Sequence, residues 1–195
     1  MKLKKWELAL AVAFALTLLG GVSLAGEQRE LSDKLVRLHV VANSDSFEDQ
    51  AAKLAARDAV LTELDALLRD ARDRGEALEL IARNLRALET AAAVAAGDFA
   101  RAKLRREYFP TREYETFSLP AGQYASLRVE LGEGVGRNWW CVVFPPLCAP
   151  SSGTADAFSA LTDGETALIT EDSAGVVVKF KAVELIGRVR AFLGI

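Results

Sequence analysis

The sequence predicts an α+β protein with a single domain, in which helices pack on a mixed or antiparallel sheet of about four to five strands. Three observations predict this class. Apolar residues recur with the period of a helix over residues 47–73 and 76–96. They alternate with polar residues, as in a strand, over residues 100–106 and 124–131. With 195 residues, 51% of them hydrophobic, the chain is long enough to bury a substantial core.

Residues 1–25 are expected to be a signal peptide or a membrane anchor. Three lysines lie within the first five residues, residues 8–24 carry no charge, and Ala25 ends a small-x-small motif that permits cleavage. The apolar run is also near the minimum length for a membrane span. Both alternatives place the domain, expected over residues 33–195, outside the cytoplasm, with transient or anchored membrane association through residues 8–24.

The first elements of the domain are a strand and a long helix. Residues 34–42 are rich in β-branched and apolar residues, which predicts a strand with Arg37 and His39 on one face. The polar turn 43–46 ends this strand and supplies an N-cap, Ser46, for a helix over 47–73. A break at Gly75 is expected to separate it from the helix 76–96.

The second half predicts more strands. Residues 139–144 are apolar on both faces, which predicts a central strand after a turn at 132–136. Residues 149–174 are expected to be rich in loops. A further strand over 176–180 and a helix over 182–193 are expected to close the chain.

One end of the first helix departs from its own apolar pattern. The stripe of leucines in its later turns continues backward onto polar side chains, and these follow the turn after the His39 strand. This places a candidate polar pocket there, consisting of His39, Asn43, Asp45, Gln50, Lys53 and Arg57. The alternative is a structural cluster of salt bridges and caps, because charges at such positions also serve stability.

The two cysteines, Cys141 and Cys148, are expected to form a disulfide if the chain is exported. The alternative is two buried thiols that pack as small hydrophobic side chains. Two cysteines with the single His39 do not make a zinc spacing, so no metal is expected, and no cofactor motif is present.

Charge and motifs exclude several functions. The formal net charge is −3, which argues against bulk nucleic-acid binding because that requires a basic face. Cys141, His39 and Asp45 are the residue types of a nucleophile, its base and an orienting acid. However, the cysteine lies in an apolar strand, where its thiolate would be disfavoured. The sequence therefore predicts a protein that is not an enzyme.

Three parts of the sequence resemble stage II sporulation protein R of endospore-forming bacteria. They are the N-terminal export segment, residues 37–61 with the motif "HVVANSDS", and residues 108–148 with "FPTREY", "LPAGQY" and "GEGVGRNWWCVVFPPLC". The resemblance implies an exported signalling protein of sporulation that acts between the forespore and mother-cell membranes. Its implied partner is a membrane-embedded aspartic protease that cleaves the sigma-E precursor.

Two neighbouring tryptophans are the candidate anchors for such a partner. Trp139 and Trp140 point to opposite faces of one strand, so one is expected to pack on the helices and the other to lie on the open face. We expect the latter beside Arg128 or the basic stripe of Arg101, Lys103 and Arg105, unless the segment after Pro150 covers it. The alternative function is an exported hydrolase, or a cell-wall- or lipid-binding module that uses the same face.

Overall fold

In the computed structural model, the described residues are 28–114 and 117–147, with the isolated positions 4, 26, 161–162, 166, 169–170, 181 and 184–185. The chain divides into two compact units. We call Ser32–Tyr108 with Gln123–Asp163 the sheet unit, and Met1–Leu31, Phe109–Gly122 and Gly164–Ile195 the hairpin unit. Each unit is described by itself.

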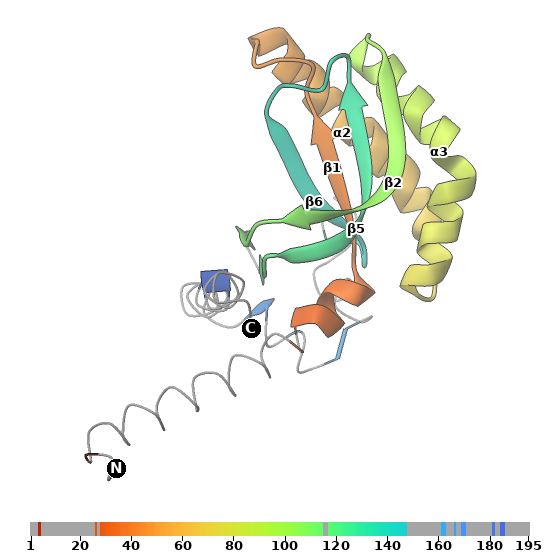
Figure 1. Cartoon of the computed structure of the whole chain (residues 1–195). Coiled ribbons are helices and arrows are strands. Elements are labelled where there is room, and N and C mark those ends of the chain that lie inside the picture. The colour runs from red at the N-terminus through yellow and green to blue at the C-terminus, as the bar shows by residue number, and fades with distance from the viewer. Residues whose placement is uncertain are drawn as a thin grey trace. The chain divides into compact units, whose positions relative to one another are not determined.

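The sheet unit contains a four-stranded mixed sheet in the order β2-β5-β1-β6 (Figure 1). Strand β1 runs parallel to β5, with His39 beside Arg128, and antiparallel to β6, with His39 beside Trp140. The elements in chain order are β1 (Val36–Val41), α2 (Phe47–Leu68), α3 (Arg74–Ala96), β2 (Ala100–Phe109), β5 (Gly122–Leu131) and β6 (Asn138–Phe144). The predicted α+β class with a mixed sheet is confirmed.

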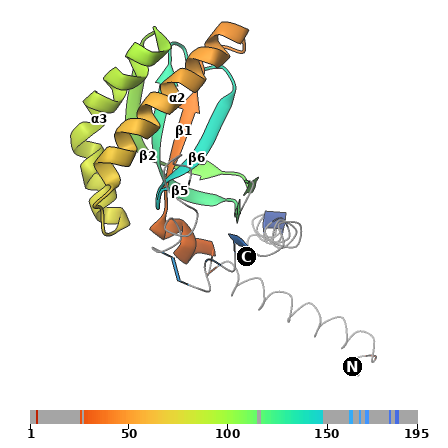
Figure 2. The same ribbon diagram turned by 180° about the vertical axis from the view of Figure 1, so that it is seen from behind.

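Helices α2 and α3 lie side by side on one face of the sheet (Figure 2). Alternate residues of β1 and β5 point into this layer, including Leu38, Val40 and Leu127, and they meet Val60 and Ile81 of the helices. All five side chains are fully buried. Burial of such side chains stabilises each by about 1.5–3 kcal/mol, so this layer holds the unit together.

Local sequence sets the ends of both helices. Ser46 caps α2 by accepting a hydrogen bond from the Asp49 amide, as the sequence predicts. Asp73 caps α3 in the same way, so the helix starts at Arg74 and Gly75 lies inside its first turn. The predicted separation of two helices is confirmed, but it lies at residues 69–73, so α2 ends earlier than predicted and Gly75 is not the break. The capping side chain, rather than the flexible glycine, decides where α3 begins. Gly97 ends α3 in the left-handed conformation at φ 65°.

Strand β6 is not central in the part of the sheet that the structure describes. It lies at one edge, next to β1, and β2 lies at the other edge. The sequence prediction of a central strand is wrong because apolar residues on both faces report what covers those faces. They do not report which strands pair along the edges.

The hairpin unit contains a short antiparallel pair, β3 (Arg112–Glu113) and β4 (Ser118–Leu119). The rings of Tyr114 and Phe117 stack at 4.5 Å between their centroids and the Tyr114 amide donates to the Phe117 carbonyl. The sequence did not predict this pair. The predicted strand 176–180 lies outside the described residues, as do most of the helix 182–193 and of the loop-rich segment 149–174.

Candidate functional site

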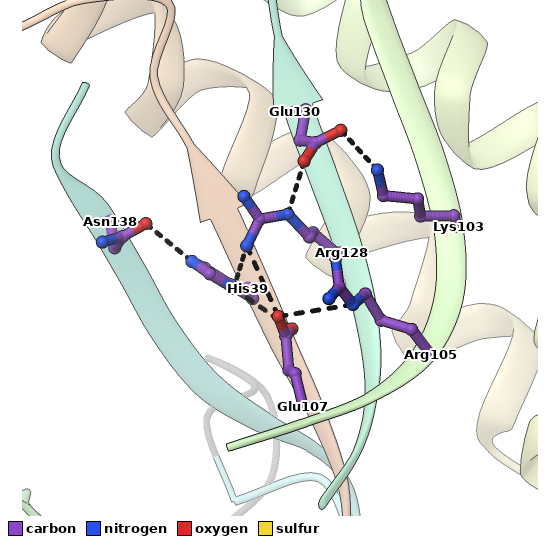
Figure 3. A network of polar contacts seen from close by, with 7 residues as sticks. All are labelled: His39, Lys103, Arg105, Glu107, Arg128, Glu130 and Asn138. Atoms are coloured by element: carbon purple, nitrogen blue, oxygen red, sulfur yellow. Dashed lines mark hydrogen bonds and ion pairs between the residues drawn. The ribbon is translucent and has the colours of Figure 1, made fainter. Parts of the chain in front are cut away.

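A polar network covers the sheet face that points away from α2 and α3, which we call the outer face (Figure 3). His39 lies at its centre on β1. Its Nε2 atom is 2.7 Å from Oδ1 of Asn138 on β6, and its Nδ1 atom is 3.1 Å from Oε1 of Glu107 on β2. Arg128 of β5 brings Nη1 within 3.1 Å of the same Nδ1 atom. Four strands therefore meet at one imidazole ring.

The network continues along the outer face through alternating charges. Arg128 donates from Nε to Oε1 of Glu130 at 2.6 Å, and Lys103 donates to Oε2 of Glu130 at 2.7 Å. The Nε atom of Arg105 lies 3.8 Å from Oε2 of Glu107. Each glutamate is thus shared between cations of neighbouring strands, which ties β2, β5 and β1 together.

Glu107 is the most perturbed acid of this network. Burial opposes its ionisation, and this is the largest single influence on its pKa. The hydrogen bond with His39 and the positive charges of His39 and Arg128 outweigh it and lower the pKa to about 2. Glu107 is therefore a carboxylate at every physiological pH, and it offers His39 an acceptor.

His39 has a partner for both of its protonation states. As a neutral ring with the proton on Nε2, it donates to Asn138 and accepts from Arg128 through Nδ1. As a cation it donates from Nδ1 to Glu107 instead. Because both ring nitrogens contact protein groups, the ring has no nitrogen directed at a substrate.

A second polar cluster lies at the loop between β1 and α2. Asp49 accepts hydrogen bonds from Asn43 and Ser44, and the Ser44 bond is the main cause that lowers the pKa of Asp49. Gln50 donates to the Ser44 carbonyl at 2.9 Å. These bonds fix the loop that follows β1, and the polar residues serve as caps of that loop and of α2.

Lys53 is a buried cation in this cluster, with 6% of the residue exposed. It donates to Oε1 of Gln50 at 2.7 Å and to the Arg137 carbonyl at 3.2 Å. Burial lowers the pKa of Lys53, and the charge of Arg137 lowers it further. Arg57, one turn later, lies over the ring of Trp139 at 5.1 Å and pairs with Asp58.

The predicted polar pocket is therefore divided. His39 points to the outer face, whereas Asn43, Gln50, Lys53 and Arg57 lie at the loop and the first turns of α2, which packs on the other face. Asp45 accepts from the Arg137 amide at 2.7 Å. The sequence could not separate them, since closeness along the chain does not show which face of the sheet a side chain reaches.

The two tryptophans lie on opposite faces, as predicted. Trp139 packs against the helix core, and Trp140 lies near His39 with ring centroids 5.6 Å apart. Of the two predicted neighbourhoods of Trp140, the basic stripe is wrong, because β6 and β2 lie at opposite edges of the sheet. Two strands therefore separate Trp140 from Arg101, Lys103 and Arg105. Arg128 lies on the far side of His39, with β1 between it and Trp140.

The candidate catalytic residues are not brought together. Cys141 pairs with Leu38, so its side chain points to the face opposite that of His39. Asp45 contacts Arg137, while His39 contacts Glu107 and Asn138. Cys141 is buried, and the described residues contain no free cysteine. Cys148 lies outside them, so the Cys141–Cys148 bridge stays a prediction.

Sequence reasoning missed Glu107, Glu130 and Asn138 as members of a site. A signal for two of them was present, because Glu107 follows the basic residues at every second position of β2, and Glu130 stands two residues after Arg128 on β5. Recognising the network requires knowing that β1 lies between β5 and β6, and this order is not visible in the sequence.

The described residues contain no group of three or more acidic, histidine or cysteine side chains arranged to hold a metal ion. In the same part of the chain, no helix has the length and apolar character needed to cross a membrane. The predicted export segment, residues 8–24, lies outside that part.

Fold and site together define an α+β protein in which the polar side chains of the outer face bind one another across a mixed sheet. The profile of the family described as "Stage II sporulation protein R (spore_II_R)" matches residues 32–153. The chain is 34% identical over 164 residues to "Stage II sporulation protein R" of Bacillus subtilis (strain 168), covering 79% of this chain and 73% of that protein. No solved structure matches. The chain belongs to the stage II sporulation protein R family.

Proposed function

We propose that this protein is an exported signal of sporulation that activates a membrane-embedded aspartic protease by binding to it, which leads to cleavage of the sigma-E precursor. Membership of the stage II sporulation protein R family carries this proposal. Its place of action would be the space between the forespore and mother-cell membranes, reached through the export segment at residues 1–25.

The geometry of the sheet unit supports binding over catalysis. Cys141 and His39 point to opposite faces of the sheet, and Asp45 contacts Arg137. A nucleophile and its base must lie within hydrogen-bond reach of each other to cooperate. An activator needs no such set, since it acts by binding the active state of its target more tightly than the inactive state. A difference of about 3 kcal/mol would raise activity about 150-fold.

The experiment is co-expression of the full chain with the protease and the sigma-E precursor in a non-sporulating bacterial host. We expect processing of the precursor only when all three proteins are present. Unchanged precursor in the presence of the exported chain and the protease would contradict the proposal.

Single isosteric variants test the catalytic alternative. His39→Gln, Asp45→Asn and Cys141→Ser should each alter processing only as far as they alter folding or protease binding. If one of them abolishes processing while the fold and the binding stay intact, the protein is an enzyme.

A further inference from the structure

Exposed hydrophobic side chains gather at one end of the sheet unit. This end, which we call the tip, lies at the carboxyl ends of β1 and β5 (Figure 1). It consists of residues 43–48, which are the loop after β1 and the start of α2, residues 94–99, which are the end of α3 and the turn after it, and loop 132–137. The tip holds most of the large exposed hydrophobic side chains of the described residues: Phe47, 88% exposed, Val94, 78%, Val135, 77%, and Phe99, 59%. Large apolar patches at the surface of soluble proteins mark interaction sites, which makes this end of the sheet unit the candidate.

The backbone of the tip is held in place before any partner binds. The Gly132 amide donates to the Phe99 carbonyl at 2.9 Å, which joins the turn after α3 to the loop after β5. The Glu133 amide donates to Oδ1 of Asn43 at 2.9 Å, and the Arg137 amide donates to Asp45, which joins that loop to the one before α2. A preorganised surface loses little conformational entropy on binding.

Glycine is required for this close approach. Gly132 has φ 52°, and a Cβ atom there would lie 2.3 Å from Oδ1 of Asn43. A Cβ atom on Gly136 would lie 2.2 Å from the Ser44 carbonyl oxygen. The "GEGVG" motif thus sets the hydrophobic Val135 at the surface while its neighbours pack on the loop after β1.

The charges around the tip select the kind of partner. Its exposed carboxylates are Asp45, Glu48, Asp98 and Glu133, and its exposed cations are Arg101 and Arg137. Arg137 pairs with Asp45 at 3.7 Å, and Arg101 lies over the ring of Phe99 at 5.6 Å. The rim is therefore net negative, which favours a basic protein surface and disfavours a membrane of anionic lipids.

We infer that the tip is the surface through which this protein binds its target, and that the target offers apolar recesses edged by lysine or arginine side chains. The inference rests on the proposed function and deepens it, because it assigns the contact to the tip. It places the contact away from Trp140, Lys103 and Arg105, which the sequence had favoured, and it retains Arg101 of the predicted basic stripe.

The test compares tip variants of the full chain in the co-expression host, with co-purification of the chain and the detergent-solubilised protease as a direct measure of binding. Phe47→Ser combined with Phe99→Ser and Val135→Ser should weaken binding by about 100-fold or more, and Phe99→Ser alone by about 10-fold. The matched control is Tyr108→Ser, since Tyr108 is 55% exposed and lies about 30 Å along β2 from Phe99. The control should bind within about twofold of the unaltered chain.

Charge-reversal variants test the acidic residues of the tip separately. Glu48→Lys combined with Glu133→Lys should weaken binding by about 10-fold, with a steeper loss at low salt, because like charges would then face each other. Glu63→Lys, in the middle of α2, should leave binding unchanged. Thermal unfolding of every variant should match that of the unaltered chain, since all of these side chains are exposed.

The outcomes separate this inference from the proposed function. If the unaltered chain does not cause processing, the proposed function fails. If the unaltered chain causes processing and the triple tip variant does so at the same dose, the inference about the tip is wrong and the proposed function stands. Two other outcomes would also overturn the inference. If the triple variant keeps protease binding but no longer self-associates in light scattering, the tip binds a second copy of the chain. If it keeps protease binding but no longer floats with phosphatidylglycerol vesicles, the tip binds a membrane.

Discussion

The replacement Glu107→Gln should destabilise the sheet unit in a way that depends on pH. Glutamine keeps the shape of the side chain and an acceptor oxygen, but it removes the negative charge shared by His39, Arg128 and Arg105. The Glu107 side chain is only 11% exposed, so solvent screens these contacts weakly. The variant therefore isolates the contribution of one charge to the stability of the network.

The size of the effect follows from the pKa of Glu107, which the folded protein lowers from 4.5 to about 2. At about 1.4 kcal/mol for each pH unit, this difference corresponds to about 3 kcal/mol. Because the folded pKa lies below the unfolded one, this stability is fully present above pH 4.5 and is lost as the pH falls toward 2. The unaltered protein should thus exceed Glu107→Gln by about 3 kcal/mol at pH 7, and by less than about half of that at pH 3.

Urea denaturation between pH 3 and pH 7, followed by tryptophan fluorescence, measures both free energies of unfolding. Glu63→Gln is the matched control on an exposed position of α2, and it should change the free energy of unfolding by less than about 0.5 kcal/mol. A loss below about 1 kcal/mol for Glu107→Gln at pH 7, or a difference that stays constant down to pH 3, would refute the reasoning.

Four further predictions concern export, the cysteines, the tip and the start of α2. Residues 1–30 fused to a reporter that is active only outside the cytoplasm should give signal, and a silent reporter would oppose export. Alkylation of the denatured, unreduced exported protein should leave Cys141 and Cys148 unmodified in mass spectrometry, whereas two alkylated thiols would exclude the bridge. Gly136→Ala should lower the free energy of unfolding by about 3 kcal/mol, because its Cβ atom would overlap a backbone oxygen. Arg57→Ala should lower the free energy of unfolding by about 1 kcal/mol through loss of its tryptophan contact. It should reduce precursor processing by more than this loss of stability explains, and a fall in processing that only matches the loss of stability would favour a purely structural role.

The elements of the sheet unit follow from local sequence. The helical period over α2 and α3 and the alternation along β2 and β5 reflect which side chains avoid water, and that choice repeats with the geometry of each element. The cap at Ser46 was also predictable, because it satisfies a backbone group within a few residues of itself. The family was likewise readable from the motifs around His39 and Trp139.

The site was decided by tertiary structure. Glu107 and Asn138 contact His39 although they lie 68 and 99 residues from it in the sequence. No local pattern predicts that β1 lies between β5 and β6. The same pairing sends His39 away from the polar start of α2 and separates Trp140 from the basic stripe of β2.

The tip shows the same division between local and long-range information. Each of Phe47, Phe99 and Val135 looks like a single exposed hydrophobic residue in the sequence, which is ordinary on protein surfaces. Only the fold places them at one end of the sheet. Strands β1 and β5 run parallel and finish at this end, and the turn after α3 is bonded to the loop after β5 there. A local pattern specifies the conformation of its own segment, whereas the neighbours of that segment depend on strand order, and strand order is fixed by the packing of the whole chain.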